Sequence, residues 1–133
     1  MALAQNSTRL LFVDDEPSIR ATLPLILRAR GFEVMVAATV PEAFQVIQQY
    51  GFDVLVSDLN ITEAGDGFKV VRAARDANPQ CVAIILTGYP AFETAVEGIQ
   101  CEIDDYVVKP ADIDLLVATM ERKLATRRSR LSD

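Results

Sequence analysis

The sequence of 133 residues contains no histidine and no tryptophan, and it has only two cysteines. The absence of histidine excludes Ser-His-Asp catalysis, histidine-based acid–base chemistry and histidine-ligated metals. Any phosphohistidine must therefore come from another molecule. Cys81 and Cys101 lack the spacing of a metal site, so we expect free thiols in a reducing compartment.

Long hydrophobic runs are also missing. The longest apolar stretches, such as "CVAIIL" at 81–86, have the length of a strand and not the ~20 residues of a membrane span. The N-terminal "MALAQNSTR" has neither the basic segment nor the apolar core of a signal peptide. We therefore expect a cytoplasmic protein without membrane association. The net charge of −6 argues against direct nucleic-acid binding, which requires a basic face.

Short apolar runs alternate with helical periodicity along the whole chain. The predicted strands are 9–13, 33–37, 53–57, 82–86 and 105–108, and several are apolar throughout, which is typical of parallel strands buried on both faces. The last helix is the clearest, with Asp112 as its N-cap and an apolar stripe of Ile113, Leu116, Val117, Met120 and Leu124. This alternation predicts one α/β domain with a doubly wound parallel sheet.

Polar residues follow four of the five predicted strands. In an open α/β sheet, ligands bind beyond the carboxyl ends of the strands. Each residue alone has an ordinary explanation as a cap, a turn or a solvated side chain. Together they predict a functional site, and the crowding of like charges after the first strand predicts a cation there. These residues are Asp14 and Asp15, Asp58, Thr87 and Lys109.

The arrangement resembles the receiver domain of two-component response regulators. The resemblance covers residues 9–126, with 1–8 and 127–133 as tails, and rests on the acidic pair in "LFVDDEP", on "VSDLN", on "ILTGY" and on "YVVKP". It implies a five-stranded sheet of order 2-1-3-4-5 in a flavodoxin-like three-layer sandwich.

The resemblance implies that Asp58 accepts a phosphoryl group from a sensor histidine kinase or a phosphotransfer protein. The reaction depends on Mg²⁺, whose protein ligands would be Asp15 directly, Asp14 through water, Asp58 and the main-chain carbonyl of Asn60. Such a domain catalyses only its own phosphorylation and dephosphorylation, so it is not an enzyme for a separate substrate. Phosphorylation would change its conformation and signal to a partner or output domain.

The same resemblance assigns the remaining residues. Lys109 and Thr87 would contact phosphoryl oxygens, and Thr87 and Tyr106 would form the conformational switch. The Lys109–Pro110 peptide bond would be cis. A homodimer would use the face formed by the fourth helix, the fifth strand and the fifth helix.

The chain departs from the family pattern in two loops. Thr62 stands where the family usually has proline, and the acidic–glycine pair Asp66–Gly67 comes one residue late, so we expect an insertion in "NITEAGDG". Pro90 and Gly98 are predicted to bracket a short fourth helix. Asn60 and Tyr89 occupy positions that tune phosphoryl lifetime in the family, so we expect a non-default dephosphorylation rate.

Three other readings compete with this one. "DLNIT" loosely matches the D-x-D-x-T motif of haloacid-dehalogenase phosphatases, but Asn60 replaces the second acid and the motif follows the third strand, not the first. A pseudo-receiver that signals without phosphate would not need all five site residues. A flavin carrier of flavodoxin type would need a phosphate-binding loop after the first strand, and "DDEPS" does not supply one.

Overall fold

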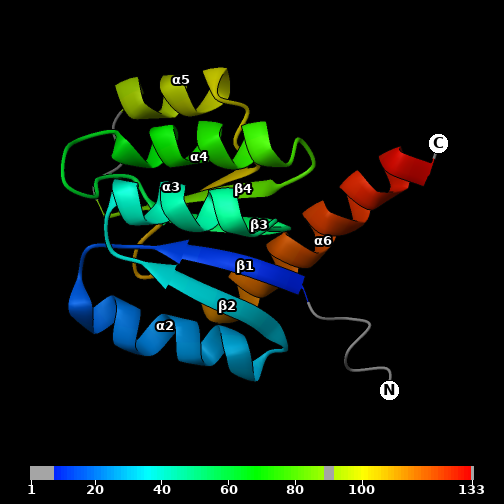
Figure 1. Ribbon diagram of the computed structural model, residues 1–133, viewed down its shortest axis with the longest axis horizontal. Coiled ribbons are helices and arrows are strands. Elements are labelled where there is room, and N and C mark those ends of the chain that lie inside the picture. The colour runs from blue at the N-terminus through cyan, green and yellow to red at the C-terminus, as the bar shows by residue number, and fades with distance from the viewer. Residues whose placement is uncertain (1–7, 89–91, 133) are drawn as a thin grey trace.

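The computed structural model describes residues 8–88 and 92–132. They form one parallel sheet with strand order β2-β1-β3-β4-β5, as predicted (Figure 1). The elements are β1 Thr8–Val13, α2 Pro17–Ala29, β2 Phe32–Ala37, α3 Val40–Gln49, β3 Val54–Asp58, α4 Asp66–Ala77, β4 Val82–Thr87, α5 Phe92–Gln100, β5 Asp105–Val108 and α6 Ile113–Ser132.

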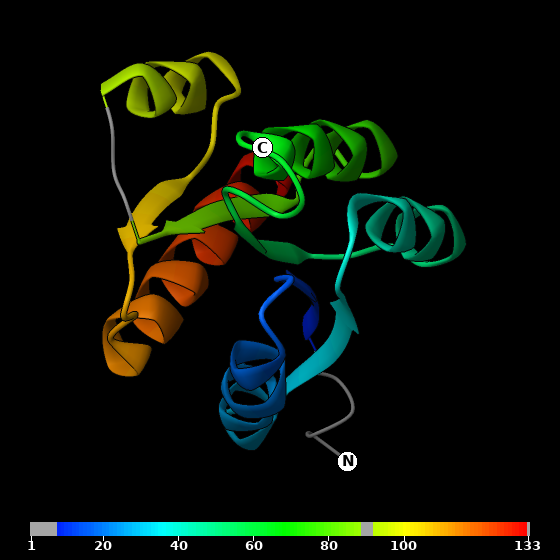
Figure 2. The same cartoon turned by 90° about the vertical axis from the view of Figure 1, so that its left-hand side faces the viewer.

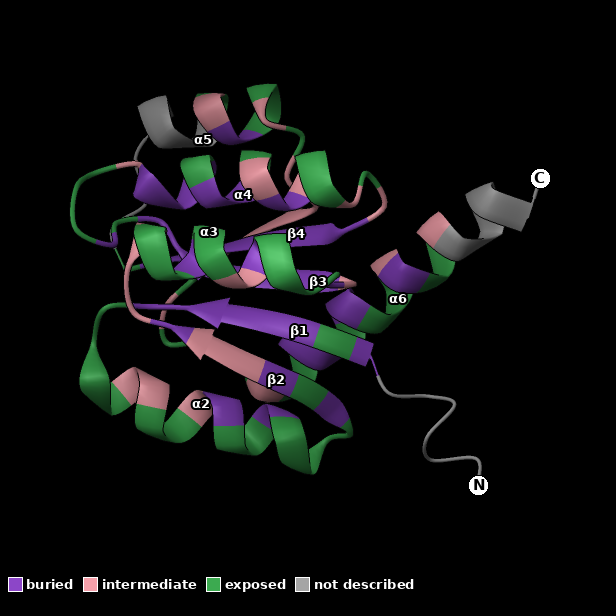
Figure 3. Cartoon of the chain, viewed as in Figure 1, coloured by how far each residue is buried: buried purple, intermediate pink, exposed green. Residues whose placement is uncertain are grey.

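The sheet is the middle of three layers. Helices α2 and α6 cover one face, and α3, α4 and α5 cover the other (Figure 2). Because successive strand residues point to opposite faces, Leu10 and Phe12 pack under α2 and α6, whereas Leu11 and Val13 pack under the other helices. Every residue of β3 and β4 is buried (Figure 3), which explains why these strands have no polar alternation.

Helix starts are set by local capping. The Thr39 hydroxyl accepts a hydrogen bond from the Glu42 N–H (3.2 Å) at the start of α3. The Asp112 carboxylate accepts one from the Leu115 N–H (3.1 Å) at the start of α6, as its predicted capping role requires. These bonds satisfy N–H groups that have no partner within the helix.

Two strands end one residue later than predicted. β3 runs to Asp58 and β4 to Thr87, because Asp58 pairs with Leu86 and Thr87 pairs with Val108 in the parallel ladder. Both polar residues are therefore the last residues of buried strands instead of the first residues of loops. Their backbones are fixed by the sheet, which is a firmer support for a site than a loop.

The predicted limits of α5 need a correction. Gly98 lies inside the helix, which continues to Gln100, and Pro90 lies outside the described residues. A Cβ at Gly98 would overlap the Ile103 side chain, so glycine here allows the helix to approach the segment before β5. Glu102 then reverses the chain with a left-handed φ of 58°, a conformation that glycine would adopt more easily.

Helix α6 continues to Ser132, beyond the predicted domain boundary at 126. Its distal half is held to the sheet by Arg127, whose guanidinium donates to both carboxylate oxygens of Asp104 (3.0 and 3.1 Å). Arg75 of α4 donates to the same carboxylate (2.8 Å), and so does the Ala83 N–H (2.8 Å). One partly buried carboxylate thus joins α4, β4 and α6 at the end of the sheet opposite Asp58.

Loss of this carboxylate charge should destabilise the fold. Asp104→Asn leaves two nearly buried guanidinium groups without their counter-ion, so the free energy of unfolding measured in urea should fall by about 3 kcal/mol. The matched control is Asp114→Asn, which breaks the exposed pair with Arg30 and should cost at most about 1 kcal/mol. Equal losses in the two variants would contradict the structural role of Asp104.

Candidate functional site

Three carboxylates meet at the carboxyl ends of β1 and β3. Asp14, Asp15 and Asp58 each place one carboxylate oxygen so that these atoms lie within 4.8 Å of one another. Asp14 is fully buried, Asp58 is 9% exposed, and Asp15 faces solvent. The sequence predicted this meeting from the strand ends, and such a group of hard oxygen donors can hold a divalent cation.

Lys109 lies between two of these carboxylates. Its Nζ is 3.0 Å from Asp14 Oδ2 and 3.3 Å from Asp58 Oδ1. The loop that carries it is attached to the sheet by a hydrogen bond from the Lys109 N–H to the Thr87 carbonyl (2.7 Å), and its peptide bond to Pro110 is cis. The ammonium group therefore reaches the end of β3 from the other side of β4.

The pKa values of this pair follow from their surroundings. Burial raises the pKa of Asp58, and the nearby charge of Asp14 raises it further, although the Lys109 ammonium counteracts part of this effect. Burial alone would lower the pKa of Lys109, but the hydrogen bond and the charge of Asp14, together with Asp58, outweigh it and raise that pKa. The lysine stays charged, and the site still has more negative charge than one lysine balances.

Asp14 is held rigidly by groups that the sequence did not point to. Its Oδ1 accepts the Glu16 N–H (2.9 Å), and its own N–H donates to the Ala37 carbonyl at the end of β2 (3.2 Å). The Arg20 guanidinium, on the first turns of α2, donates to the Asp14 main-chain carbonyl (3.0 Å). No sequence motif pointed to Arg20, because a side chain that bonds to the backbone leaves no recognisable pattern.

The two predicted switch residues lie on neighbouring strands. Thr87 is 1% exposed and ends β4 beside Asp58. Tyr106 on β5 is half-buried and packs against the core under α3 and α4. The part that Thr87, Tyr106 and the Asn60 carbonyl take in any reaction stays a prediction, and Tyr89 lies outside the described residues.

Helix α4 starts against the backbone of Asp58. It begins at Asp66, the late acidic residue that the sequence marked, and the Gly67 N–H donates to the Leu59 carbonyl (2.8 Å). A Cβ at position 67 would overlap the Asp58 carbonyl oxygen. Glycine is therefore required for this close approach of helix and strand.

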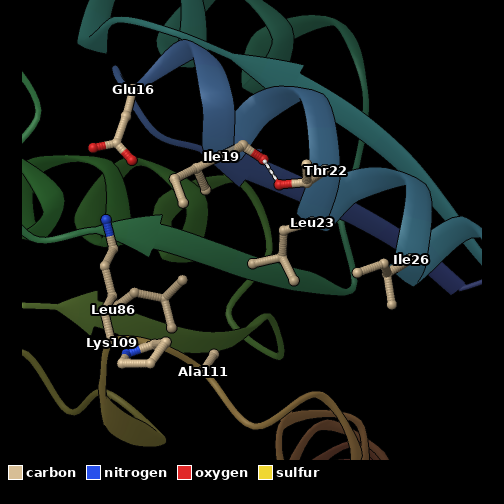
Figure 4. Close-up of a pocket in the computed structure, with 9 residues that line it drawn as sticks. Glu16, Ile19, Thr22, Leu23, Ile26, Leu86, Lys109 and Ala111 are labelled. Atoms are coloured by element: carbon tan, nitrogen blue, oxygen red, sulfur yellow. Dashed lines mark hydrogen bonds between the residues drawn. The ribbon is translucent and has the colours of Figure 1, made fainter.

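An apolar groove of about 410 Å³ leads away from Lys109 between α2 and the segment that precedes α6. Figure 4 shows Glu16 and Lys109 at one end of it, and Ile19, Leu23 and Ile26 along the α2 side. The charged part of the site thus borders directly on an apolar surface.

Comparison with known proteins decides the family. Residues 10–121 match the response regulator receiver domain family. The chain belongs to this family. Receiver domains are signalling domains of two-component response regulators, so the predicted fold and function class are both confirmed. No helix within 8–88 or 92–132 is long and apolar enough to cross a membrane.

Individual relatives agree with this assignment. The transcriptional regulatory protein ZraR of Escherichia coli (strain K12) is 32% identical over 123 residues, which are 92% of this chain and 28% of that protein. The chain thus spans little more than a quarter of that relative. The CheY-like receiver domain from Methanospirillum hungatei JF-1 has a TM-score of 0.86 at 26% identity, covering 94% of this chain and 99% of that one. The chemotaxis regulator CheY4 of Vibrio cholerae has a TM-score of 0.78 at 32% identity, covering 89% and 99%.

The raised pKa of Asp58 predicts a pH-dependent stability. Because the pKa of Asp58 is higher in the folded protein, the folded state binds the proton of this carboxyl group more tightly than the unfolded chain does. The stabilisation from the protonated group is complete below the ordinary pKa of 3.8 and is lost as the pH rises through the higher folded value. In buffer with a chelator, Asp58→Asn should therefore have a higher free energy of unfolding than the wild type at pH 7. This advantage should shrink as the pH falls toward 3.8.

Urea unfolding at several pH values measures this difference. Asp53→Asn is the matched control, because Asp53 precedes the same strand at its opposite end and lies outside the carboxylate cluster. An Asp58→Asn protein that is less stable than the wild type at pH 7 would contradict the electrostatic account.

Proposed function

We propose that this receiver domain, comprising at least residues 9–126, stores a phosphoryl group on Asp58. The observation that carries the proposal is the position of the Asp58 carboxylate, at the end of a buried strand, within reach of two acidic side chains and 3.3 Å from the Lys109 ammonium. A nucleophilic carboxylate needs this combination of firm support and nearby positive charge, because both it and the phosphoryl group are anionic.

The residues fit a Mg²⁺ ion. Asp15 is exposed and able to bind the ion directly, whereas buried Asp14 already accepts hydrogen bonds from Lys109 and Glu16, which favours contact through water. Asp58 and the main-chain carbonyl of Asn60 complete the proposed set of protein ligands. Mg²⁺ prefers such oxygen ligands and keeps several waters, and when bound it supplies positive charge that offsets the negative charge of the reactants.

The chain's own groups then perform the transfer. An Asp58 carboxylate oxygen attacks the phosphorus of a phosphohistidine, the O–P bond forms as the P–N bond breaks, and the imidazole nitrogen keeps the electron pair. Lys109 stabilises charge on a phosphoryl oxygen, and Thr87 donates its hydroxyl to another. Hydrolysis of the same acyl phosphate returns the domain to its initial state, so its catalysis is limited to its own phosphorylation and dephosphorylation.

The switch uses the neighbouring strands. Once Asp58 is phosphorylated, Thr87 moves toward the new oxygens, and Tyr106 turns inward on β5. Support comes from the sheet itself, in which β4 joins the acceptor strand to β5. The change then reaches the face of α5, β5 and α6.

The partners follow from the same reading. Because this chain has no histidine, the phosphohistidine belongs to another protein, a sensor histidine kinase or a phosphotransfer protein. Both partners act in the cytoplasm. The α5–β5–α6 face exposes Ile99 (76%), Val108 (49%) and Leu115 (65%), which suits a homodimer contact. Signal output passes to a partner or an attached domain, and the receiver itself does not contact nucleic acid.

The acceptor assignment can be tested by labelling. Incubation with radiolabelled acetyl phosphate and Mg²⁺ should give a slow, hydroxylamine-labile label that Asp58→Asn abolishes, while Asp53→Asn keeps it. Retained labelling in Asp58→Asn would refute the acceptor role. Sustained multiple turnover of p-nitrophenyl phosphate by the wild type would instead favour a phosphatase, and a folded wild type that takes no label would favour a pseudo-receiver.

The metal assignment predicts a second loss. Asp15→Ala removes a direct ligand, so the Mg²⁺ dissociation constant measured by calorimetry should rise at least about tenfold, the low end of what even indirect supporting residues cost. Asp53→Asn again serves as the control and should bind Mg²⁺ as the wild type does. Unchanged affinity in Asp15→Ala would move the direct ligand role elsewhere.

A further inference from the structure

The loop between Asp58 and α4 is held in the core at its beginning only. Leu59 (1% exposed) and Ile61 (2%) bury their side chains on either side of exposed Asn60. The next residues, Thr62, Glu63 and Ala64, are all exposed. Apolar burial therefore does not fix the second half of this loop, and polar contacts have to do so.

Asp66 supplies these contacts from the first turn of α4. It is 5% exposed, and its Oδ2 accepts hydrogen bonds from both the Thr62 N–H (3.2 Å) and the Glu63 N–H (2.9 Å). Lys69, one turn along the helix, has its ammonium 3.4 Å from the other oxygen. Hydrogen bonds from the main chain, that of Glu63 first, lower the pKa of Asp66, so the group stays charged at neutral pH.

A second bond closes the loop from its other end. The Asn60 side-chain oxygen accepts the Gly65 N–H (3.0 Å), and Gly65 turns the chain into the helix with a left-handed φ of 81°. Two side chains at the ends of the loop, Asn60 and Asp66, thus bind three of its main-chain N–H groups. The loop is therefore shaped by its own side chains over the stretch that follows Asn60.

We propose that Asp66 is a positioning residue for the cation site: by binding the Thr62 and Glu63 N–H groups, it fixes the loop from which the main-chain carbonyl of Asn60 binds the ion. The proposal rests on the proposed function of the site. Asp66 itself lies outside the carboxylate cluster of Asp14, Asp15 and Asp58, so it acts through the loop and not as a ligand. Groups of this kind that support metal ligands affect affinity strongly, although they do not touch the metal.

Substitutions of Asp66 separate positioning from charge. Asp66→Ala removes the acceptor, so the Mg²⁺ dissociation constant measured by calorimetry should rise about tenfold. Asp66→Asn keeps an oxygen of the same shape that accepts both N–H groups, so it should restore most of the wild-type affinity. In labelling with acetyl phosphate, Asp66→Ala should raise the Mg²⁺ concentration for half-maximal rate and leave the rate at saturating Mg²⁺ nearly unchanged.

A stability control guards against a general loss of structure. Asp104→Asn removes the charge of a partly buried carboxylate that also accepts a main-chain N–H, at the opposite end of the sheet, and it should leave Mg²⁺ affinity unchanged. All variants are compared at a temperature at which circular dichroism shows them folded. If Asp66→Ala does not fold, Asp66→Glu tests the same contacts, because it keeps the charge but moves the carboxylate by one methylene group relative to the Thr62 and Glu63 N–H groups, and it should also weaken Mg²⁺ binding.

The outcomes are distinct. Wild-type affinity in folded Asp66→Ala, or in Asp66→Glu if that variant has to be used, would overturn the proposal. So would an Asp66→Asn protein as weak as Asp66→Ala, or an equal loss in Asp104→Asn. A wild type that neither binds Mg²⁺ nor takes a label would instead refute the proposed function of the whole site.

Discussion

The repulsion between two buried carboxylates is the constraint on which the site depends. Asp14 is fully buried and Asp58 nearly so, and Lys109 is the ammonium that lies within 3.3 Å of both. With Asp15 beside them, three acidic groups face one basic group; burial raises the pKa of Asp58, and the charge of Asp14 raises it further. A divalent cation bound among the three carboxylates reduces the repulsion between them.

The two ends of the sheet use opposite electrostatic solutions. At the carboxyl ends of the strands, negative charge exceeds positive charge, and the site can gain a cation. At the other end, Asp104 meets two guanidinium groups from α4 and α6, so its charge is fully compensated within the chain. The carboxylate cluster suits a site whose charge changes during function. The ion pairs of Asp104 suit a fixed contact between α4 and α6.

The sequence was sufficient for the sheet and for the meeting of Asp14, Asp15, Asp58 and Lys109 at one edge of it, because both follow from local pattern. Apolar runs mark buried strands, and the residue that ends each run arrives at a common edge. It was not sufficient for contacts between distant side chains, such as Arg127 with Asp104 or Lys109 with Asp14. It also placed the end of α5 at Gly98, because a glycine that permits close packing cannot be told by pattern from one that ends a helix.

The departures from the family pattern receive a partial physical account. Thr62 has an N–H that proline would lack, and this N–H is bound by the late acidic residue Asp66. The threonine at position 62 and the acidic residue at position 66 of "NITEAGDG" are therefore connected by a hydrogen bond, which neither residue alone would have indicated. The folded loop shows that Thr62 and Asp66 belong to one hydrogen-bonded arrangement.

The contact of Gly67 with the strand links two parts of the chain that a sequence treats as separate. The Cβ of any larger residue would collide with the carbonyl oxygen of Asp58, and the helix would have to move away from the sheet. Position 67 therefore needs glycine for α4 to stay in contact with β3, so the strand that carries Asp58 and the first turn of α4 constrain each other.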